Sequence, residues 1–137
     1  RELEELPLGA EARRTLAAIP SLRGGPECLE RARELGEPVR RATDRLATTY
    51  AALRERGVAD RVQLDLGLLR NLGYYTGTIL EVYDPALGHV LGGGGRYDEL
   101  MGRFGRPLPA VGFALHLERV HIAQAEEERL AREEAGA

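Results

Sequence analysis

The sequence predicts an α+β protein in which an antiparallel sheet is flanked by helices. Up to about residue 60, apolar residues recur every three or four positions, which is the spacing of a helix with one buried face. Beyond that point apolar and polar residues alternate, as they do in half-buried strands. We therefore divide the chain into a helical segment, 1–60, and a mixed segment, 61–137, which we expect to form one structural unit.

Three helices are expected in the helical segment, over 10–19, 26–35 and 38–56, because proline or glycine bounds each one. The residues between the first two, 21–27, contain the run Gly-Gly-Pro and are expected to form a turn. The third helix has an apolar stripe with helical spacing, which consists of Val39, Ala42, Leu46, Tyr50 and Leu53.

Four strands are expected in the mixed segment. They cover residues 62–68, 76–83, 89–95 and 110–115. The turn at 84–88 joins the second and third strands so tightly that these two must be antiparallel. A short helix is expected over 96–104 and a long one over 116–132. An antiparallel sheet with helices beside it belongs to the α+β class.

The composition excludes several kinds of site. The chain has 137 residues and a formal net charge of −3, without the basic excess of a nucleic-acid surface. All 19 residues in the lysine-plus-arginine count are arginine, so neither a lysine Schiff base nor a P-loop lysine can be present. Cys28 is the single cysteine, which rules out an intrachain disulfide and a multi-cysteine zinc site. We expect it to pack as a small hydrophobe.

A cytoplasmic protein is expected, because no apolar run is long enough to span a membrane and no signal-peptide pattern is present. No spacing of histidine, cysteine and carboxylate residues indicates a metal site. The sequence starts at Arg1 inside a helical pattern, which indicates a piece of a longer chain.

Two stretches contain the candidate binding residues. "RNLGYYTG", residues 70–77, has two tyrosines behind an arginine, and "GGGGRYDEL", residues 92–100, has four glycines before an Arg-Tyr pair. Four glycines in a row indicate either a flexible loop or a backbone that another group approaches closely. The turn at 84–88 already supplies the loop, which favours close approach. A phosphate loop fits poorly, because neither G-K-[ST] nor G-x-G-x-x-G is present.

Taken singly, these residues have ordinary explanations, since a tyrosine is most often core and an arginine most often lies at the surface. On neighbouring strands they form a set, which consists of Arg70, Tyr74, Tyr75, Gly93, Gly94 and Tyr97. A guanidinium binds a carboxylate through two parallel hydrogen bonds, and tyrosine hydroxyls orient a polar ring. Because adjacent residues of an extended segment point to opposite faces, one of the two neighbouring tyrosines is expected to line the site and the other the core. The set predicts a site for a small zwitterion with an aromatic or polar side chain.

The segments "LLRNLGYYTGTILEVYD" and "GGGGRYDELMGRFGRPLPAVGFALHLERV" closely resemble the second half of the histidyl-tRNA synthetase-like catalytic domain, a class II synthetase core. In that family "RGLDYYTG" is a signature for histidine binding, and "GGRYD" supplies a neighbouring strand. "AVGFALHLERV" resembles class II motif 3, with Gly112 and Arg119 as matching residues. The resemblance covers 61–122 and implies part of a class II synthetase core. Motifs 1 and 2 lie upstream in the family and are absent from this sequence.

Two branches of the family are similar to this chain. One is the synthetase, and the other is the synthetase-like regulatory subunit of ATP phosphoribosyltransferase, the first enzyme of histidine biosynthesis. Residues 19–35 look more like the regulatory branch. Asn71 and Gly73 stand where the synthetase signature has Gly and Asp, and His116 stands where motif 3 has a glycine. These departures favour the regulatory branch.

The resemblance to the regulatory branch implies a protein without catalytic residues, cofactor or metal. Such a subunit binds histidine, activates a short-form catalytic subunit in a hetero-oligomer and helps transmit feedback inhibition; neither nucleic acid nor a membrane is expected as a partner. In the implied histidine site Arg70 meets the carboxylate. The residues implied around the imidazole and its space are Tyr74, Tyr75, Tyr97, Gly93 and Gly94. Arg70 and Arg119 also match arginines of the active synthetase, so a fragment of an ATP-dependent histidyl-tRNA synthetase is the alternative.

Overall fold

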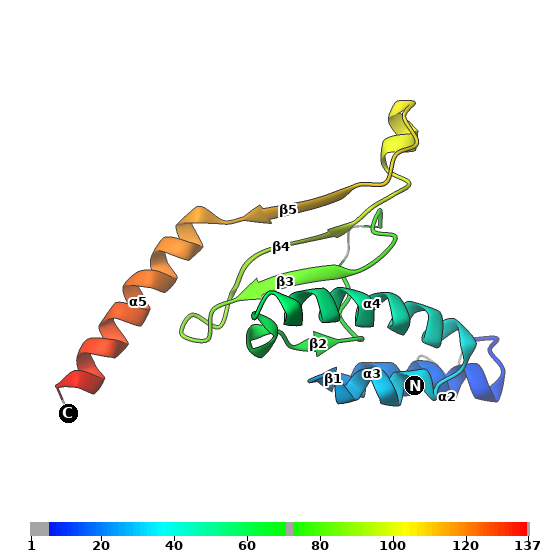
Figure 1. The fold of residues 1–137 in the computed structure, drawn as a ribbon, viewed down its shortest axis with the longest axis horizontal. Coiled ribbons are helices and arrows are strands. Elements are labelled where there is room, and N and C mark those ends of the chain that lie inside the picture. The colour runs from blue at the N-terminus through cyan, green and yellow to red at the C-terminus, as the bar shows by residue number, and fades with distance from the viewer. Residues whose placement is uncertain (1–5, 71–72, 137) are drawn as a thin grey trace. The chain divides into compact units, whose positions relative to one another are not determined.

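The computed structural model describes residues 6–70 and 73–136. The chain forms two compact units, an N-terminal unit that ends at Leu69 and a C-terminal unit that begins at Arg70 (Figure 1). The sequence divides the chain by secondary structure after residue 60, and that domain assignment stays a prediction.

Among its described residues, the N-terminal unit contains three α-helices, two short 3₁₀ segments and one short pair of antiparallel strands. α2 spans Ala10–Ala18, α3 spans Glu27–Arg33 and α4 spans Glu37–Glu55, so the three expected helices are confirmed. β1, Arg23–Gly24, pairs with β2, Leu64–Asp65.

The strand expected over 62–68 was wrong in its length, and β2 does not join a larger sheet. Asp65 ends it, because its Oδ1 accepts a hydrogen bond from the Gly67 backbone N–H at 2.9 Å and turns the chain. Gly67 lies so close to Pro20 that an added Cβ would be 2.9 Å from the proline Cα. The turn expected at 21–27 contains β1, which the sequence does not reveal because two residues show no periodicity.

A small apolar core holds the N-terminal unit together. Its buried members are Cys28, Leu29 and Leu64, and the partly buried side chains packed on them are Leu46, Ala47, Tyr50, Val62 and Leu66. Leu46 and Tyr50 belong to the stripe expected on α4, whereas Ala42 of that stripe is exposed. Cys28 is fully buried, as expected, and this burial raises the pKa of its thiol.

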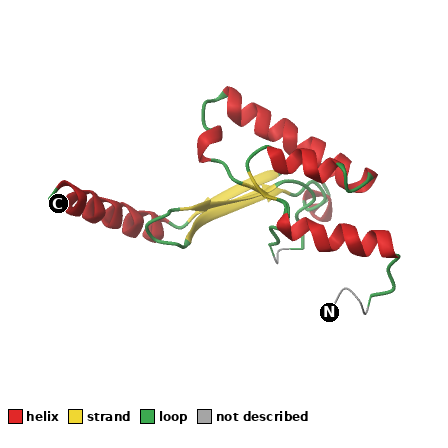
Figure 2. Cartoon of the chain, turned by 90° about the horizontal axis from the view of Figure 1, so that it is seen from below, coloured by secondary structure: helices red, strands yellow, loops and turns green. Residues whose placement is uncertain are grey.

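The C-terminal unit is built on a three-stranded antiparallel sheet in the order β3-β4-β5, drawn in yellow in Figure 2. β3 spans Ile79–Tyr83, β4 spans Val90–Arg96 and β5 spans Val111–Leu115. These strands confirm the α+β class and three of the expected strands. The expected turn at 84–88 is also formed, because the Asp84 carboxylate accepts hydrogen bonds from two backbone N–H groups within it.

The helix expected over 96–104 was wrong, since this segment has only a 3₁₀ turn at Met101–Phe104. The Asp98 side chain binds neighbouring strand ends instead. Its Oδ1 accepts a hydrogen bond from the Ala110 backbone N–H at 3.2 Å, and its Oδ2 lies 2.7 Å from Arg96 Nε. These contacts fix Asp98 in a turn at the end of β4.

β5 lies at one edge of the sheet, and one of its faces is apolar and open. Val111, Phe113 and Leu115 alternate along this face and are 73%, 54% and 46% exposed. Gly112 and Ala114 face the other side of the sheet, because successive residues of a strand point in opposite directions. The larger apolar side chains of β5 therefore pack against little of the chain that the structure describes.

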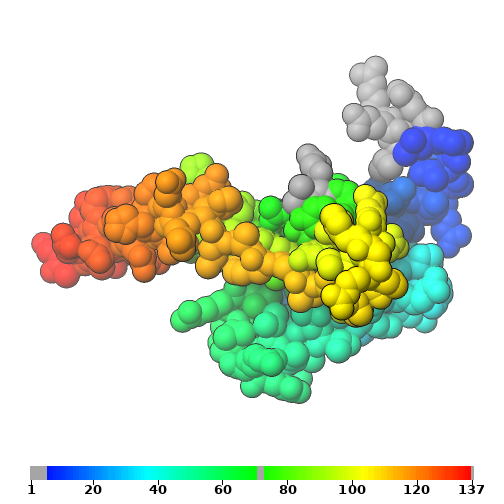
Figure 3. Space-filling model, turned by 90° about the horizontal axis from the view of Figure 1, so that it is seen from above, coloured from blue at the N-terminus to red at the C-terminus, as the bar shows by residue number. Residues whose placement is uncertain are grey.

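α5 follows β5 directly and spans Leu117–Ala135, which confirms the helix expected at this position. Its first turn is held to the sheet by Arg119, whose Nη1 donates a hydrogen bond to the Val90 carbonyl oxygen at 2.7 Å. Ala123 is the buried residue of this helix. Figure 3 shows the solvent-exposed surface of α5 in orange to red. Among the described residues, no helix combines the length and the apolar character that crossing a membrane requires.

Candidate functional site

The Arg70 side chain lies against the bare backbone of Gly93 in the middle of β4. A Cβ built on Gly93 would overlap Arg70 Nη1 and would lie 3.2 Å from its Cζ. The structure thus brings together the arginine and the glycine strip that the sequence predicts to be neighbours. Any side chain at position 93 would displace the guanidinium.

Glu81 is the acidic partner of Arg70 and lies outside the set of site residues predicted from the sequence. It lies directly opposite Gly93 in the sheet register, and its Oε1 is 3.3 Å from Arg70 Nη1. The side chains of Arg70 and Glu81 are 24% and 14% exposed, so the pair is largely shielded from water. Nη1 is buried, and no described residue accepts a well-aligned hydrogen bond from it.

The three tyrosines of the predicted site form one cluster. The ring centroids of Tyr74 and Tyr75 are 4.6 Å apart, and the Tyr97 ring is 5.4 Å from Tyr74 and 6.3 Å from Tyr75. A hydrogen bond with Tyr74 is the main cause of the raised pKa of Tyr75, followed by burial. Tyr74 and Tyr75 do not point to opposite faces as expected, because they lie at the end of a turn and not in a strand.

Two glycines outside the predicted set make room for this cluster. A Cβ on Gly95 would lie 2.8 Å from the Tyr75 ring, and one on Gly112 would overlap the Tyr97 hydroxyl. Gly94 has a different neighbour: its added Cβ would overlap the Gly112 carbonyl oxygen of β5. Gly94 is therefore explained by the close approach of two strands and lies away from the guanidinium.

A hollow of about 350 Å³ opens beside two of the tyrosines, Tyr74 and Tyr75. Its lining residues are Gly73, Tyr74, Tyr75, Thr76, Glu99, Leu100 and Arg103. The sequence predicts space between Arg70 and the glycine strip, whereas the guanidinium itself fills that position and the space lies next to the rings. Glu99 and Arg103 were not anticipated, because the segment that contains them was expected to be a helix.

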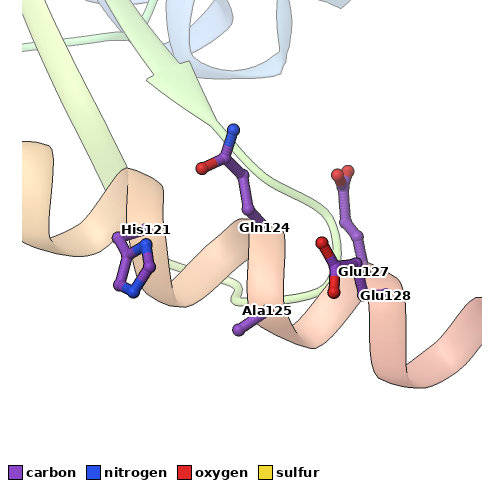
Figure 4. A pocket seen from close by; sticks show the side chains of 5 residues that line it. All are labelled: His121, Gln124, Ala125, Glu127 and Glu128. Carbon is purple, nitrogen blue, oxygen red and sulfur yellow. The ribbon is translucent and has the colours of Figure 1, made fainter.

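A second hollow, of about 370 Å³, lies along α5 and differs from this site in its lining. All of its lining side chains belong to that one helix (Figure 4), and they are His121, Gln124, Ala125, Glu127 and Glu128. A shallow surface of one helix has no converging groups from a second element. Within the described ranges, no group of three histidine, cysteine or carboxylate side chains could hold a metal ion.

The residues that resemble motif 3 are also engaged within the fold. Gly112 lies under Tyr97, and the Arg119 guanidinium binds the Val90 carbonyl oxygen at the start of β4. The backbone N–H of His116 donates to the Leu91 carbonyl oxygen at 2.8 Å, which continues the sheet to the first turn of α5. Asn71, one of the departures from the synthetase signature, lies outside the described residues.

These features define a class II synthetase-like module with an arginine and a tyrosine cluster over a run of four glycines in one strand. The model of the histidyl-tRNA synthetase family matches residues 1–120, and the chain belongs to this family. More particularly, it is similar to regulatory subunits of ATP phosphoribosyltransferase. The protein of that name from Desulforamulus reducens is 52% identical over 115 residues, which cover 82% of this chain and 28% of the relative. That from Anaeromyxobacter dehalogenans is 50% identical, covering 80% of this chain and 32% of the relative.

Solved structures agree with this similarity. The crystal structure of an ATP phosphoribosyltransferase regulatory subunit/histidyl-tRNA synthetase from Bacillus halodurans matches with a TM-score of 0.80 at 35% identity, over 89% of this chain and 33% of that one. A histidine–tRNA ligase subunit from Alicyclobacillus acidocaldarius matches with a TM-score of 0.68 at 30% identity, over 92% and 51% of the two chains. The chain spans about 30% of the length of the curated relatives it matches. The resemblance to the regulatory branch is confirmed.

Proposed function

We propose that the complete protein is a non-catalytic regulatory subunit of ATP phosphoribosyltransferase that binds histidine. The observation that carries the proposal is the position of Arg70 over Gly93 next to three clustered tyrosines. The names of the similar proteins support the same role. The proposal includes the cytoplasmic location expected from the sequence.

The chemistry of the cluster suits a free amino acid with a polar ring. Part of the Arg70 side chain remains exposed, so a ligand carboxylate has access to it. A hydrogen bond between charged groups contributes about 1.5–3 kcal/mol net. The tyrosine hydroxyls and the hollow beside them offer partners and space for an imidazole.

The first turn of α5 supports a role without ATP chemistry. The Arg119 guanidinium is bound by a backbone carbonyl, and His116 adds an imidazole where the family motif has a glycine. A regulatory role then requires that histidine bind one assembly state better than another, typically by about 1–3 kcal/mol. The partner in that assembly is the short-form catalytic subunit.

One observation favours a second candidate. Arg70 matches the synthetase signature, and one similar structure is described as a histidine–tRNA ligase subunit. A synthetase exchanges pyrophosphate into ATP in the presence of histidine. A regulatory subunit fails that assay and raises phosphoribosyl transfer when it is mixed with the catalytic subunit. The two assays on the complete protein therefore distinguish the candidates.

The histidine site is tested by the substitution Arg70→Ala in the complete protein. Calorimetry is expected to show a loss of histidine affinity of about tenfold or more, because the ligand carboxylate loses a charge-assisted partner. Arg106→Ala is the matched control, since Arg106 is exposed in the loop before β5. Unchanged histidine affinity in Arg70→Ala would remove Arg70 from the site.

A further inference from the structure

We infer that Glu81 is a positioning residue that holds the Arg70 guanidinium over Gly93, where it can meet a ligand carboxylate. The inference rests on the proposed histidine site and adds to it a residue outside the set predicted from the sequence. Glu81 and Gly93 are register partners in neighbouring strands, so the Glu81 side chain and the open side of Gly93 face the same way. The guanidinium occupies the space between them.

Among the described residues, Glu81 is the group that forms an ion pair with the Arg70 guanidinium. Oε1 of Glu81 is 3.3 Å from Nη1, and no described side chain or backbone group accepts a well-aligned hydrogen bond from that nitrogen. A shielded charge on a long, flexible side chain needs a partner, and here the group of opposite charge is Glu81. Loss of the Glu81 charge leaves Arg70 free to turn toward water.

Glu81 is itself held by the strand that contains it. The Tyr83 hydroxyl donates a hydrogen bond to Oε2, two residues further along the same face of β3. The two carboxylate oxygens are thus divided between a tyrosine and the guanidinium. This division favours a positioning role over direct contact with the ligand ammonium group, because both oxygens already have partners.

The test compares two ligands on the complete protein. Histidine and L-histidinol share the amine and the imidazole, but only histidine has a carboxylate. In calorimetry, Glu81→Gln is expected to weaken histidine binding by about tenfold and to leave histidinol binding unchanged, as Arg70→Gln should. Glu118→Gln is the matched control, since Glu118 is exposed on the first turn of α5, and it should change neither ligand. Equal weakening of both ligands by Glu81→Gln would overturn the positioning role.

A second readout does not depend on histidine. The Nε–Hε signal of Arg70, assigned from its loss in Arg70→Lys, should shift in the NMR spectrum of Glu81→Gln and stay in place in Glu118→Gln. If the wild-type protein does not bind histidine but the Arg70 signal shifts in Glu81→Gln, the proposed function is wrong and the positioning of Arg70 by Glu81 is supported. If histidine binds and Glu81→Gln changes neither the signal nor the ligand preference, the proposed function stands and the positioning role falls.

A milder variant covers the case in which Glu81→Gln does not fold. Tyr83→Phe keeps the ring and removes the hydroxyl that binds Oε2. It is expected to reduce the preference for histidine over histidinol in the same direction, by a smaller factor. An unchanged preference in folded Tyr83→Phe, together with an unshifted Arg70 signal, would overturn the inference.

Discussion

The four consecutive glycines of β4 have two different physical causes. Gly93 and Gly95 lie under side chains, those of Arg70 and Tyr75. At the two other positions, 92 and 94, an added Cβ would overlap backbone atoms of β5. The four glycines therefore meet two requirements in alternation. Gly93 and Gly95 leave room for side chains of the candidate site, and Gly92 and Gly94 leave room for the backbone of β5.

The substitution Gly93→Ala tests the first cause. The new methyl group would overlap Arg70 Nη1 and lie 2.7 Å from the Leu80 carbonyl oxygen, so it must displace the guanidinium and strain the strand. We expect the free energy of unfolding to fall by about 1–3 kcal/mol, the usual cost of overpacking, together with a loss of histidine affinity. Urea unfolding and calorimetry measure the two effects.

Gly102→Ala is the control for this substitution, because a Cβ at that position has open space around it. It should leave stability and histidine affinity nearly unchanged. Equal stability of Gly93→Ala and Gly102→Ala would contradict the close approach of Arg70.

The residues of the site differ in how far the sequence predicts them. Arg70, the tyrosines and Gly93 stand out because their types are unusual together, and the structure brings them together. Glu81 was missed although it carried a signal: a carboxylate in the middle of an apolar strand needs a partner of opposite charge. Glu99 and Arg103 carried none, since charged residues in a presumed surface helix are ordinary.

Among the elements, the connection between β4 and β5 departs from its helical pattern and is fixed by contacts of one residue, Asp98. The Asp98 backbone N–H donates to Thr76 Oγ1 at 2.9 Å, and its carboxylate binds Ala110 N and Arg96 Nε. One residue thus joins three separate stretches of the C-terminal unit. Hydrophobic periodicity cannot reveal such contacts, because they depend on partners that are distant in sequence.

The substitution Asp98→Ala should loosen this connection. The free energy of unfolding is expected to fall by about 1–3 kcal/mol, because Ala110 N–H and Arg96 lose a charged acceptor. Hydrogen exchange at Ala110 should quicken at the same time. Asp98→Asn, which keeps an acceptor oxygen, should retain most of the protection, and equal exchange rates in both variants would contradict the role of the carboxylate.

The same contrast runs through the other elements. Helices α2 to α5 follow from periodicity and from prolines and glycines at their ends, so their positions were predictable. The two-residue pair β1–β2 was not, because its paired residues are 40 and 42 positions apart and the strands are too short to leave a pattern. Long elements can be predicted from the local sequence, whereas the short strands form because of residues that are distant in sequence.

Over the whole chain, the buried apolar side chains are distributed unevenly. Those of the N-terminal unit are Leu22, Cys28, Leu29, Ala32 and Leu64, whereas Leu91 and Ala123 are those of the C-terminal unit within the described residues. The C-terminal unit depends more on the hydrogen bonds of its sheet. Cys28, the single cysteine, lies in the core of the N-terminal unit, which has more buried apolar side chains.

This position makes Cys28 a probe of unfolding. Its thiol should react with Ellman's reagent about 100-fold or more slowly in the native protein than in denaturant, because it is fully buried and its pKa is raised by burial. The reaction is followed by absorbance. Thr48→Cys in a Cys28→Ala background is the control, since Thr48 is exposed on α4 and a thiol there should react at once. Rapid labelling of native Cys28 would contradict the buried core.

The open face of β5 has a practical consequence for work with this segment. Among the described residues β5 is an edge strand with the exposed apolar side chains of Val111, Phe113 and Leu115, and such an edge is a template for pairing with another extended chain. The substitution Phe113→Lys is therefore expected to oppose such pairing by charge repulsion, and because these 137 residues contain no lysine it would also add a single side-chain amine for attaching a label.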